Sequence, residues 1–172
     1  KSIEPSARGE LEITDAIQWM VDQGHRIDPH IVQGWWKDTG RLADMLEANR
    51  LILDRIERSI EGEVIDSEVE GRVIIEPGAK VERVRILGPA IIGAGAQLSD
   101  CYIGPYTAID ADCVVEGAES EYSILLAGSS VRNLDGRMEA SLLGKDAAIL
   151  RGDRQPRAHR FLVGDNSTIE IL

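Results

Sequence analysis

Two cysteines, Cys101 and Cys113, are the side chains in this 172-residue sequence with the most evident capacity for redox chemistry or soft-metal binding. Neither belongs to a CxxC pair, and neither has a nearby histidine. Zinc sites and disulfide frameworks are recognised by closely spaced ligands and by an oxidising compartment, respectively. We therefore predict two free thiols in a reducing compartment.

The charged residues near the N-terminus have simple structural explanations. Arg8 lies close to Glu10 and Glu12, as on a solvated charged strand. Asp38 precedes a predicted helix, and as its N-cap it would stabilise the first turn by about 1 kcal/mol. The residue types alone give none of these side chains a chemical role.

Composition narrows the classes of protein to consider. The formal net charge is -11, which opposes the phosphate backbone of nucleic acids and makes them poor partners. No stretch approaches the roughly 18 apolar residues of a membrane span, and the first residues show no signal-peptide pattern, so we expect a cytoplasmic protein. Aromatic residues make up only 4% and there are 17 glycines, so the core must consist mainly of small and aliphatic side chains.

Two helices are expected in residues 1–58. An apolar stripe follows Thr14 and Asp15, either of which could be the N-cap, and Gly24 would end this first helix. Residues 26–31 and 32–38 are predicted to form two short strands. A second helix is expected after Asp38, with its apolar face at Leu42, Met45, Leu46, Ile52, Leu53 and Ile56. These residues are too few to close a core alone, so they should be the end of a larger α/β domain.

From Glu61 the apolar period becomes six. Large aliphatic residues mark thirteen hexads, and the residue two positions before each marker is small or β-branched. The markers are Val69, Ile75, Val81, Ile86, Ile92, Leu98, Ile103, Ile109, Val115, Leu125, Val131, Leu143 and Ile149. Such a pattern indicates a solenoid in which three flat faces close one coil and the aliphatic side chains fill the interior.

Two steps of five residues give coils of 17 residues, so Ile75, Ile92 and Ile109 should stack about 4.8 Å apart. The pattern is interrupted at 117–120 and at 133–140, where we expect loops that leave the coil. Residues 151–172 form a polar tail, and 161–163 with 169–172 could return as a capping strand.

Hexads of this kind resemble the repeat of left-handed β-helix proteins, over residues 64–150. The stretch KSIEPSARGELEITD at 1–15, with GWWKDTGRLADMLEANR at 34–50 and RAHRFLVGDNS at 157–167, resembles the long form of glucose-1-phosphate thymidylyltransferase. The resemblance implies a fold class: an α/β remnant of a nucleotidyltransferase domain (1–58), an all-β left-handed parallel β-helix (59–150), and the tail (151–172).

The same resemblance implies roles for five residues. Arg8 corresponds to the catalytic arginine that faces the sugar phosphate, which its planar, permanently charged fork suits. Glu12 and Thr14 would lie near glucose hydroxyls, and Trp36 against the sugar. Asp38 matches an aspartate that helps to hold Mg²⁺.

The implied reaction joins glucose 1-phosphate to dTTP and forms dTDP-glucose and pyrophosphate. Mg²⁺ needs a second acid beside Asp38, and neither that acid nor the family's glycine-rich nucleotide loop is visible in the sequence. This chain alone is therefore expected to be inactive, and the complete protein to be a homo-oligomer. The base specificity rests on the resemblance.

Two other functions stay open at this point. Acyltransferases with this solenoid use a loop histidine as a base, but His159 lies in the tail after the coils. An acyltransferase or bifunctional enzyme would bind acetyl-CoA. A non-catalytic scaffold solenoid would need neither Arg8 nor Asp38.

Overall fold

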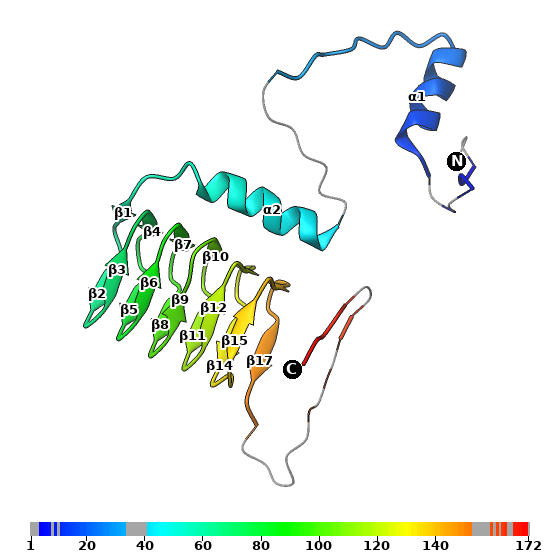
Figure 1. The fold of residues 1–172 in the computed structure, drawn as a ribbon. Helices are drawn as coiled ribbons and strands as arrows, with labels where there is room; N and C mark the ends of the chain where they lie inside the picture. Colours follow the sequence, from blue (N-terminus) through cyan, green and yellow to red (C-terminus); the bar gives the residue numbers. More distant parts are fainter. Residues whose placement is uncertain are drawn as a thin grey trace. The chain divides into compact units, whose positions relative to one another are not determined.

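The computed structural model describes residues 4–7, 9, 11–33, 41–152, 159, 161, 163–164 and 167–171. The chain forms two compact units, residues 1–36 and 37–172, and each is described by itself. The first unit contains helix α1 (Ile13–Asp22). The second contains helix α2 (Leu42–Leu53), followed by strands β1 to β17 (Figure 1).

The strands are short, of two or three residues each. They are β1 (Ser59–Ile60), β2 (Glu63–Ile65), β3 (Glu68–Glu70), β4 (Val73–Ile75), β5 (Lys80–Glu82), β6 (Arg85–Leu87), β7 (Ala90–Ile92), β8 (Gln97–Ser99), β9 (Tyr102–Ile103), β10 (Thr107–Ile109), β11 (Val114–Glu116), β12 (Glu119–Glu121), β13 (Ile124–Leu125), β14 (Ser130–Arg132), β15 (Arg137–Glu139), β16 (Leu142–Leu143) and β17 (Ala148–Leu150).

Every third strand belongs to the same parallel sheet. The first sheet has the order β1-β4-β7-β10-β13-β16, the second runs from β2 to β17, and the third from β3 to β15. Each coil thus contributes one strand to each sheet, and the backbone hydrogen bonds run between coils. This parallel β-solenoid, after a short helical segment, confirms the predicted fold class.

The predicted aliphatic markers fill the interior. Ile75 pairs with Ile92, and Ile92 with Ile109, each 17 residues further along the chain, as the hexad count predicts. All three are buried, and burying one such side chain contributes about 1.5–3 kcal/mol. Most residues two before the markers, such as Ala90 and Cys113, are buried beside them, and Ser67, Ser141 and Ala147 are half-buried.

The predicted loops at 117–120 and 133–140 were wrong in one respect, because both segments contain a strand of the third sheet. Ser120 in β12 pairs with Ile103 and with Met138 in β15, so the coil is complete at both places. The interior position holds a serine and a methionine there instead of a marker aliphatic. The coil therefore forms at both places although the sequence lacks the large aliphatic residue by which the repeat was recognised.

The corners of the coil need backbone with positive φ, and residues stack there in columns. At the corner after the first sheet the column is Gly78, Gly95, Asp112, Gly128 and Asp146, with φ between 57° and 78°. A Cβ on Gly95 would lie 2.5 Å from the Oδ1 atom of Asp112 in the next coil. Glycine at this position therefore meets the conformational requirement of the corner, and its lack of a Cβ leaves room for the Asp112 carboxylate.

In the first unit, α1 begins two residues earlier than the earlier of its two predicted caps, Thr14, allows. Glu12 is the N-cap, so Thr14 and Asp15 lie inside the first turn, where the negative charge of Asp15 is favourable. Gly24 has a φ of 77° and follows the helix end, as predicted. The predicted strand at 26–31 was wrong: residues 25–33 have no regular structure, because no described strand pairs with them.

The second helix also starts elsewhere than expected. Its N-cap is Arg41, whose N–H donates to Asp44 Oδ2 (3.2 Å), so Asp38 is not the N-cap. Leu46 and Leu53 are buried, whereas Met45 and Ile52 of the predicted apolar face are exposed. The described residues of the tail, 151–152, 159, 161, 163–164 and 167–171, contain no strand, and their apolar side chains, such as Phe161, are exposed. Leu162 and Leu172 of the predicted capping strand lie outside the described residues.

Candidate functional site

The N-terminal end of α1 carries the two predicted sugar-binding residues that the structure describes. Glu12 is half-buried, and its Oε1 atom accepts a hydrogen bond from the Ser6 hydroxyl (2.9 Å). Thr14 is exposed in the first turn. The other three predicted site residues, Arg8, Trp36 and Asp38, lie outside the described residues. The structure therefore places Glu12 and Thr14 at one helix end and does not test the predicted site as a whole.

Helix α1 is amphipathic, and none of its residues is buried. Ile13, Ile17 and Val21 recur at helical spacing, and their exposed fractions are 73%, 41% and 51%. Leu11 and Trp19 add to this surface. An apolar helix face of this kind normally packs against another layer of a domain.

Helix α2 is fixed to the solenoid by polar contacts at the corner between the third and first sheets. The Asn49 side chain donates to the Tyr106 carbonyl (3.0 Å), and the Tyr106 hydroxyl donates to Asp54 Oδ1 (3.1 Å). Arg72 donates to the Asp54 carbonyl and forms an ion pair with its carboxylate (3.5 Å). The hexad pattern did not single out Tyr106 or Arg72, because both lie between markers.

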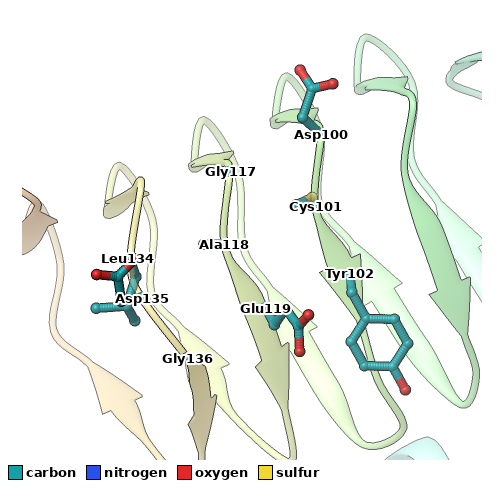
Figure 2. Close-up of a pocket in the computed structure, with 9 residues that line it drawn as sticks. All are labelled: Asp100, Cys101, Tyr102, Gly117, Ala118, Glu119, Leu134, Asp135 and Gly136. Atoms are coloured by element: carbon teal, nitrogen blue, oxygen red, sulfur yellow. The ribbon is translucent and has the colours of Figure 1, made fainter.

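A groove of about 440 Å³ lies on the solenoid where three successive coils turn from the second sheet into the third (Figure 2). Its polar side chains include Asp100, Tyr102, Glu119 and Asp135. The sequence analysis did not predict this groove. Its residues sit at strand ends and turns, where the repeat places no marker.

Arginines neutralise the acids of the groove. Arg83 forms a bidentate pair with Asp100, with both N···O distances at 2.7 Å, and holds the pKa of that carboxyl below its usual range. Arg137 pairs with Glu119 (3.2 Å) and lies over the Tyr102 ring, 4.9 Å from its centroid. These exposed pairs stabilise the stack of coils only modestly.

The Cys101 thiol beside this groove is a poor nucleophile. Burial raises its pKa to about 12, and the charge of Asp100 contributes in the same direction. Both cysteines are buried and free, as predicted. His159 stacks on Phe161 in the tail, with ring centroids 5.9 Å apart.

No three His, Cys, Asp or Glu side chains in the described part of the chain group as metal ligands. None of the described helices has the length and apolar character needed to cross a membrane.

Residues 1–55 match the nucleotidyl transferase family. With the solenoid that follows, the chain has the organisation of a nucleotidyltransferase segment that carries a parallel β-solenoid. The matched segment ends within two residues of the end of α2, so it includes both helices of the described structure.

Individual relatives of known name indicate a narrower class than this family match does. The glucose-1-phosphate thymidylyltransferase of Streptomyces antibioticus is 49% identical over 172 residues, which are 99% of this chain and 48% of the relative. That of Streptomyces griseus is 45% identical over 171 residues, with the same coverage. The bifunctional sugar-1-phosphate nucleotidylyltransferase/acetyltransferase of Sulfurisphaera tokodaii is 34% identical over 137 residues, 77% of this chain and 34% of the relative.

These comparisons place the chain in the sugar-1-phosphate nucleotidyltransferase family and confirm its resemblance to glucose-1-phosphate thymidylyltransferase. The chain spans about half the length of the curated thymidylyltransferases it matches.

Proposed function

We propose that this chain is part of an enzyme that makes dTDP-glucose and pyrophosphate from glucose 1-phosphate and dTTP. The observation that carries the proposal is the identity of 49% and 45% to two glucose-1-phosphate thymidylyltransferases across 99% of the chain. The aligned residues include both the helical segment and the solenoid. It supports a shared substrate class for the complete proteins.

In the proposed reaction, an oxygen of glucose 1-phosphate attacks the α-phosphorus of dTTP in line. The bond from that phosphorus to the oxygen bridging the α- and β-phosphates breaks, and pyrophosphate leaves with the electron pair. Arg8 holds the sugar phosphate through two parallel N–H donors. Glu12 and Thr14 bind sugar hydroxyls at the start of α1, and Trp36 packs against the sugar ring.

Mg²⁺ fits the donor chemistry of Asp38, because hard cations prefer carboxylate and phosphate oxygens. The described residues contain no ready-made group of three metal ligands. Asp38 would therefore supply one ligand, and the nucleotide and a further acid of the complete protein would supply the others. The bound cation would neutralise charge on the reacting phosphates.

The exposed apolar face of α1 supports the assignment of the first unit to a larger domain. Ile13, Ile17 and Val21 would pack against the remainder of the nucleotidyltransferase domain. The complete protein would then be about twice as long as this chain, as its curated relatives are. We also keep a cytoplasmic homo-oligomer as a prediction, which the molar mass of the complete protein in solution would test.

Substitution of Asp38 in the full-length protein tests the site. Asp38→Ala should lower Mg²⁺-dependent pyrophosphate release at least about a hundredfold, because one metal ligand is lost. Asp28→Ala is a matched control, since the Asp28 side chain is 62% exposed and its ion pair within the described part of the chain is with Arg26, which is 87% exposed. Normal turnover of Asp38→Ala would contradict the assigned metal ligand.

A second activity, acetyl transfer, is favoured by one observation, the likeness to the bifunctional relative. Its test is acetyl-CoA-dependent acetylation of the sugar phosphate by the full-length protein. Because His159 is the histidine nearest the end of the solenoid, His159→Ala should abolish that activity if it is the base. Acetylation that survives His159→Ala would exclude His159 as the base.

A further inference from the structure

The outer face of the first sheet differs in chemistry from the outer faces of the other two sheets. Its outward-facing side chains are apolar and half-buried in five successive coils: Ile74, Ile91, Ala108, Ile124 and Leu142. The outward-facing positions of the second and third sheets include many charged side chains, such as Glu82, Arg132 and Arg137. A continuous apolar strip on a solenoid whose other faces are charged indicates an interaction surface.

A groove of about 230 Å³ lies on this strip, at the edge where the chain leaves the first sheet. The apolar side chains that line it include those of Ile91, Ala108, Ile124 and Leu126. Its charged residues are Glu76 and Asp110, whose carboxylates accept hydrogen bonds from backbone N–H groups of the next coil. Neither carboxylate forms an ion pair within the described part of the chain. This first-sheet groove is therefore apolar and carries uncompensated negative charge.

Helix α2 carries a stripe with the complementary chemistry. Its residues Leu46 and Leu53 are buried, whereas Met45 and Ile52, also two turns apart, are 38% and 56% exposed. The spacing continues past the helix end to Arg55, which is exposed and has no ion pair with the described residues. We call Met45, Ile52 and Arg55 the α2 stripe. An apolar stripe that ends in a cation matches an apolar groove that carries negative charge.

The contacts of α2 fix the position of this stripe along the solenoid. Asp54 pairs with Arg72 (3.5 Å), which directly precedes β4. The Asn49 side chain donates to the Tyr106 carbonyl (3.0 Å), and Tyr106 directly precedes β10. The helix thus lies along the edge at which the chain enters the first sheet, beside β4, β7 and β10 (Figure 1). The α2 stripe therefore covers the same coils as the groove.

The two edges of the first sheet correspond coil by coil. Glu76 directly follows β4 and Asp110 directly follows β10, so both lie on the edge opposite α2. A two-fold axis parallel to the solenoid axis exchanges the two edges and keeps every coil at its own height. In such a pair, α2 of each copy lies along the groove of the other, and Arg55 meets Glu76. Each contact then occurs twice, as in any isologous interface.

We infer that the first-sheet groove binds a second copy of this chain: the α2 stripe of one copy packs into the groove of the other, and Arg55 pairs with Glu76 across the contact. This inference names the surface that holds the predicted homo-oligomer together. It does not depend on the proposed reaction, because none of these residues belongs to the proposed sugar or metal site.

The first test measures the association of the full-length protein by sedimentation equilibrium over a series of concentrations. Ile124→Asp places a charge in the groove, twice in each pair of copies, and should raise the dissociation constant at least about a hundredfold. Val114→Asp is the matched control, since Val114 is also a half-buried, outward-facing strand residue but lies on the second sheet. It should leave the dissociation constant unchanged.

A charge-reversal pair tests the contact without changing its apolar part. Arg55→Glu and Glu76→Arg should each raise the dissociation constant roughly tenfold, because each brings like charges together across the interface. The double variant should return it to within about threefold of the wild-type value. Such a rescue cannot come from misfolding, since it requires the two side chains to meet between copies.

The outcomes decide the inference separately from the proposed function. A full-length protein that is monomeric at every concentration, or an Ile124→Asp variant that associates as tightly as the wild type, would overturn the inference. So would an Ile124→Asp variant that keeps its molar mass but unfolds at lower urea concentration, because another part of the same chain would then cover the groove. None of these results involves pyrophosphate release, so the proposed function would stand or fall on its own assay.

Discussion

Among single residues, Cys101 shows how strongly the solenoid interior changes side-chain chemistry. Cys101 as a residue is 8% exposed, and burial raises the pKa of its thiol to about 12 from an ordinary value near 9. The charged thiolate is disfavoured because it would lose its hydration inside the coil. The sequence correctly indicated two free thiols, since their spacing suits neither a disulfide framework nor a zinc site.

This pKa difference makes stability depend on pH. The folded chain holds the Cys101 proton more tightly than the unfolded chain does. The contribution of the buried thiol to the free energy of unfolding is therefore complete below pH 9. It decreases between pH 9 and about 12, by up to about 1.4 kcal/mol per pH unit. The free energy of unfolding of wild type and of Cys101→Ala can be measured in urea at pH 8, 9 and 10. The difference between the two proteins should become smaller above pH 9. A difference in the free energy of unfolding that does not change with pH would contradict the raised pKa.

Two buried hydroxyls lack hydrogen-bond partners in the described structure, those of Thr107 and Ser120. Both residues are at most 1% exposed. An unpaired buried hydroxyl costs about 1–3 kcal/mol of stability. Nothing in the structure explains why these positions are polar.

Thr107→Val keeps the shape of the side chain and removes the unpaired hydroxyl. We expect the free energy of unfolding to rise by about 1 kcal/mol. Ser123→Ala is the opposite case, because the Ser123 hydroxyl donates to the Glu121 carbonyl (2.7 Å) and accepts from the Ser141 N–H (3.2 Å). It should destabilise the protein by about 1 kcal/mol or more. Chemical unfolding measures both, and a Thr107→Val protein less stable than wild type would contradict the account.

On the scale of elements, the repeat predicted most of the solenoid from sequence. The markers and their small partners predicted the interior positions, because a coil interior tolerates only certain sizes of side chain. The prediction failed at 117–120 and 133–140, where Ser120 and Met138 occupy interior positions. Backbone pairing between coils does not depend on side-chain type, so those strands form without an apolar signal.

Less of the candidate site than of the solenoid could be predicted from the residues themselves. Its five residues came from a family resemblance, and the described structure places only Glu12 and Thr14. The attachment of α2 to Tyr106 could not be predicted, because it joins residues more than fifty positions apart that share no periodicity. The strand expected at 26–31 was predicted from local propensity alone. A strand also needs a neighbouring strand to pair with, and the local sequence does not show whether one is present.

Two glycines at equivalent corner positions test the packing between coils. Gly93 follows Ile92, and Gly144 follows Leu143 in the same sheet. A Cβ on Gly93 would lie 2.6 Å from the Asp110 carbonyl carbon, whereas a Cβ on Gly144 would meet no atom within 4 Å. Gly93→Ala should therefore lower the free energy of unfolding by about 1–3 kcal/mol, and Gly144→Ala should change it by less than about 0.5 kcal/mol. Equal effects in thermal or urea unfolding would contradict the predicted steric difference.

For the whole molecule, the solenoid extends the nucleotidyltransferase segment and is attached to it through α2. The ends of such a stack need covering, and Leu150 in the last strand is 62% exposed. Together with the apolar face of α1, this exposure supports the view that the complete protein buries surfaces that this chain leaves open. The proposed function is therefore one that the complete protein would carry out.

Pyrophosphate release is the most direct test of that central claim. The full-length protein would be given glucose 1-phosphate, Mg²⁺ and each nucleoside triphosphate in turn, with the 172-residue chain assayed in parallel. We predict turnover with dTTP by the full-length protein and none by the chain alone. Absence of pyrophosphate release with every triphosphate would contradict the proposed function and favour a scaffold or acyltransferase role.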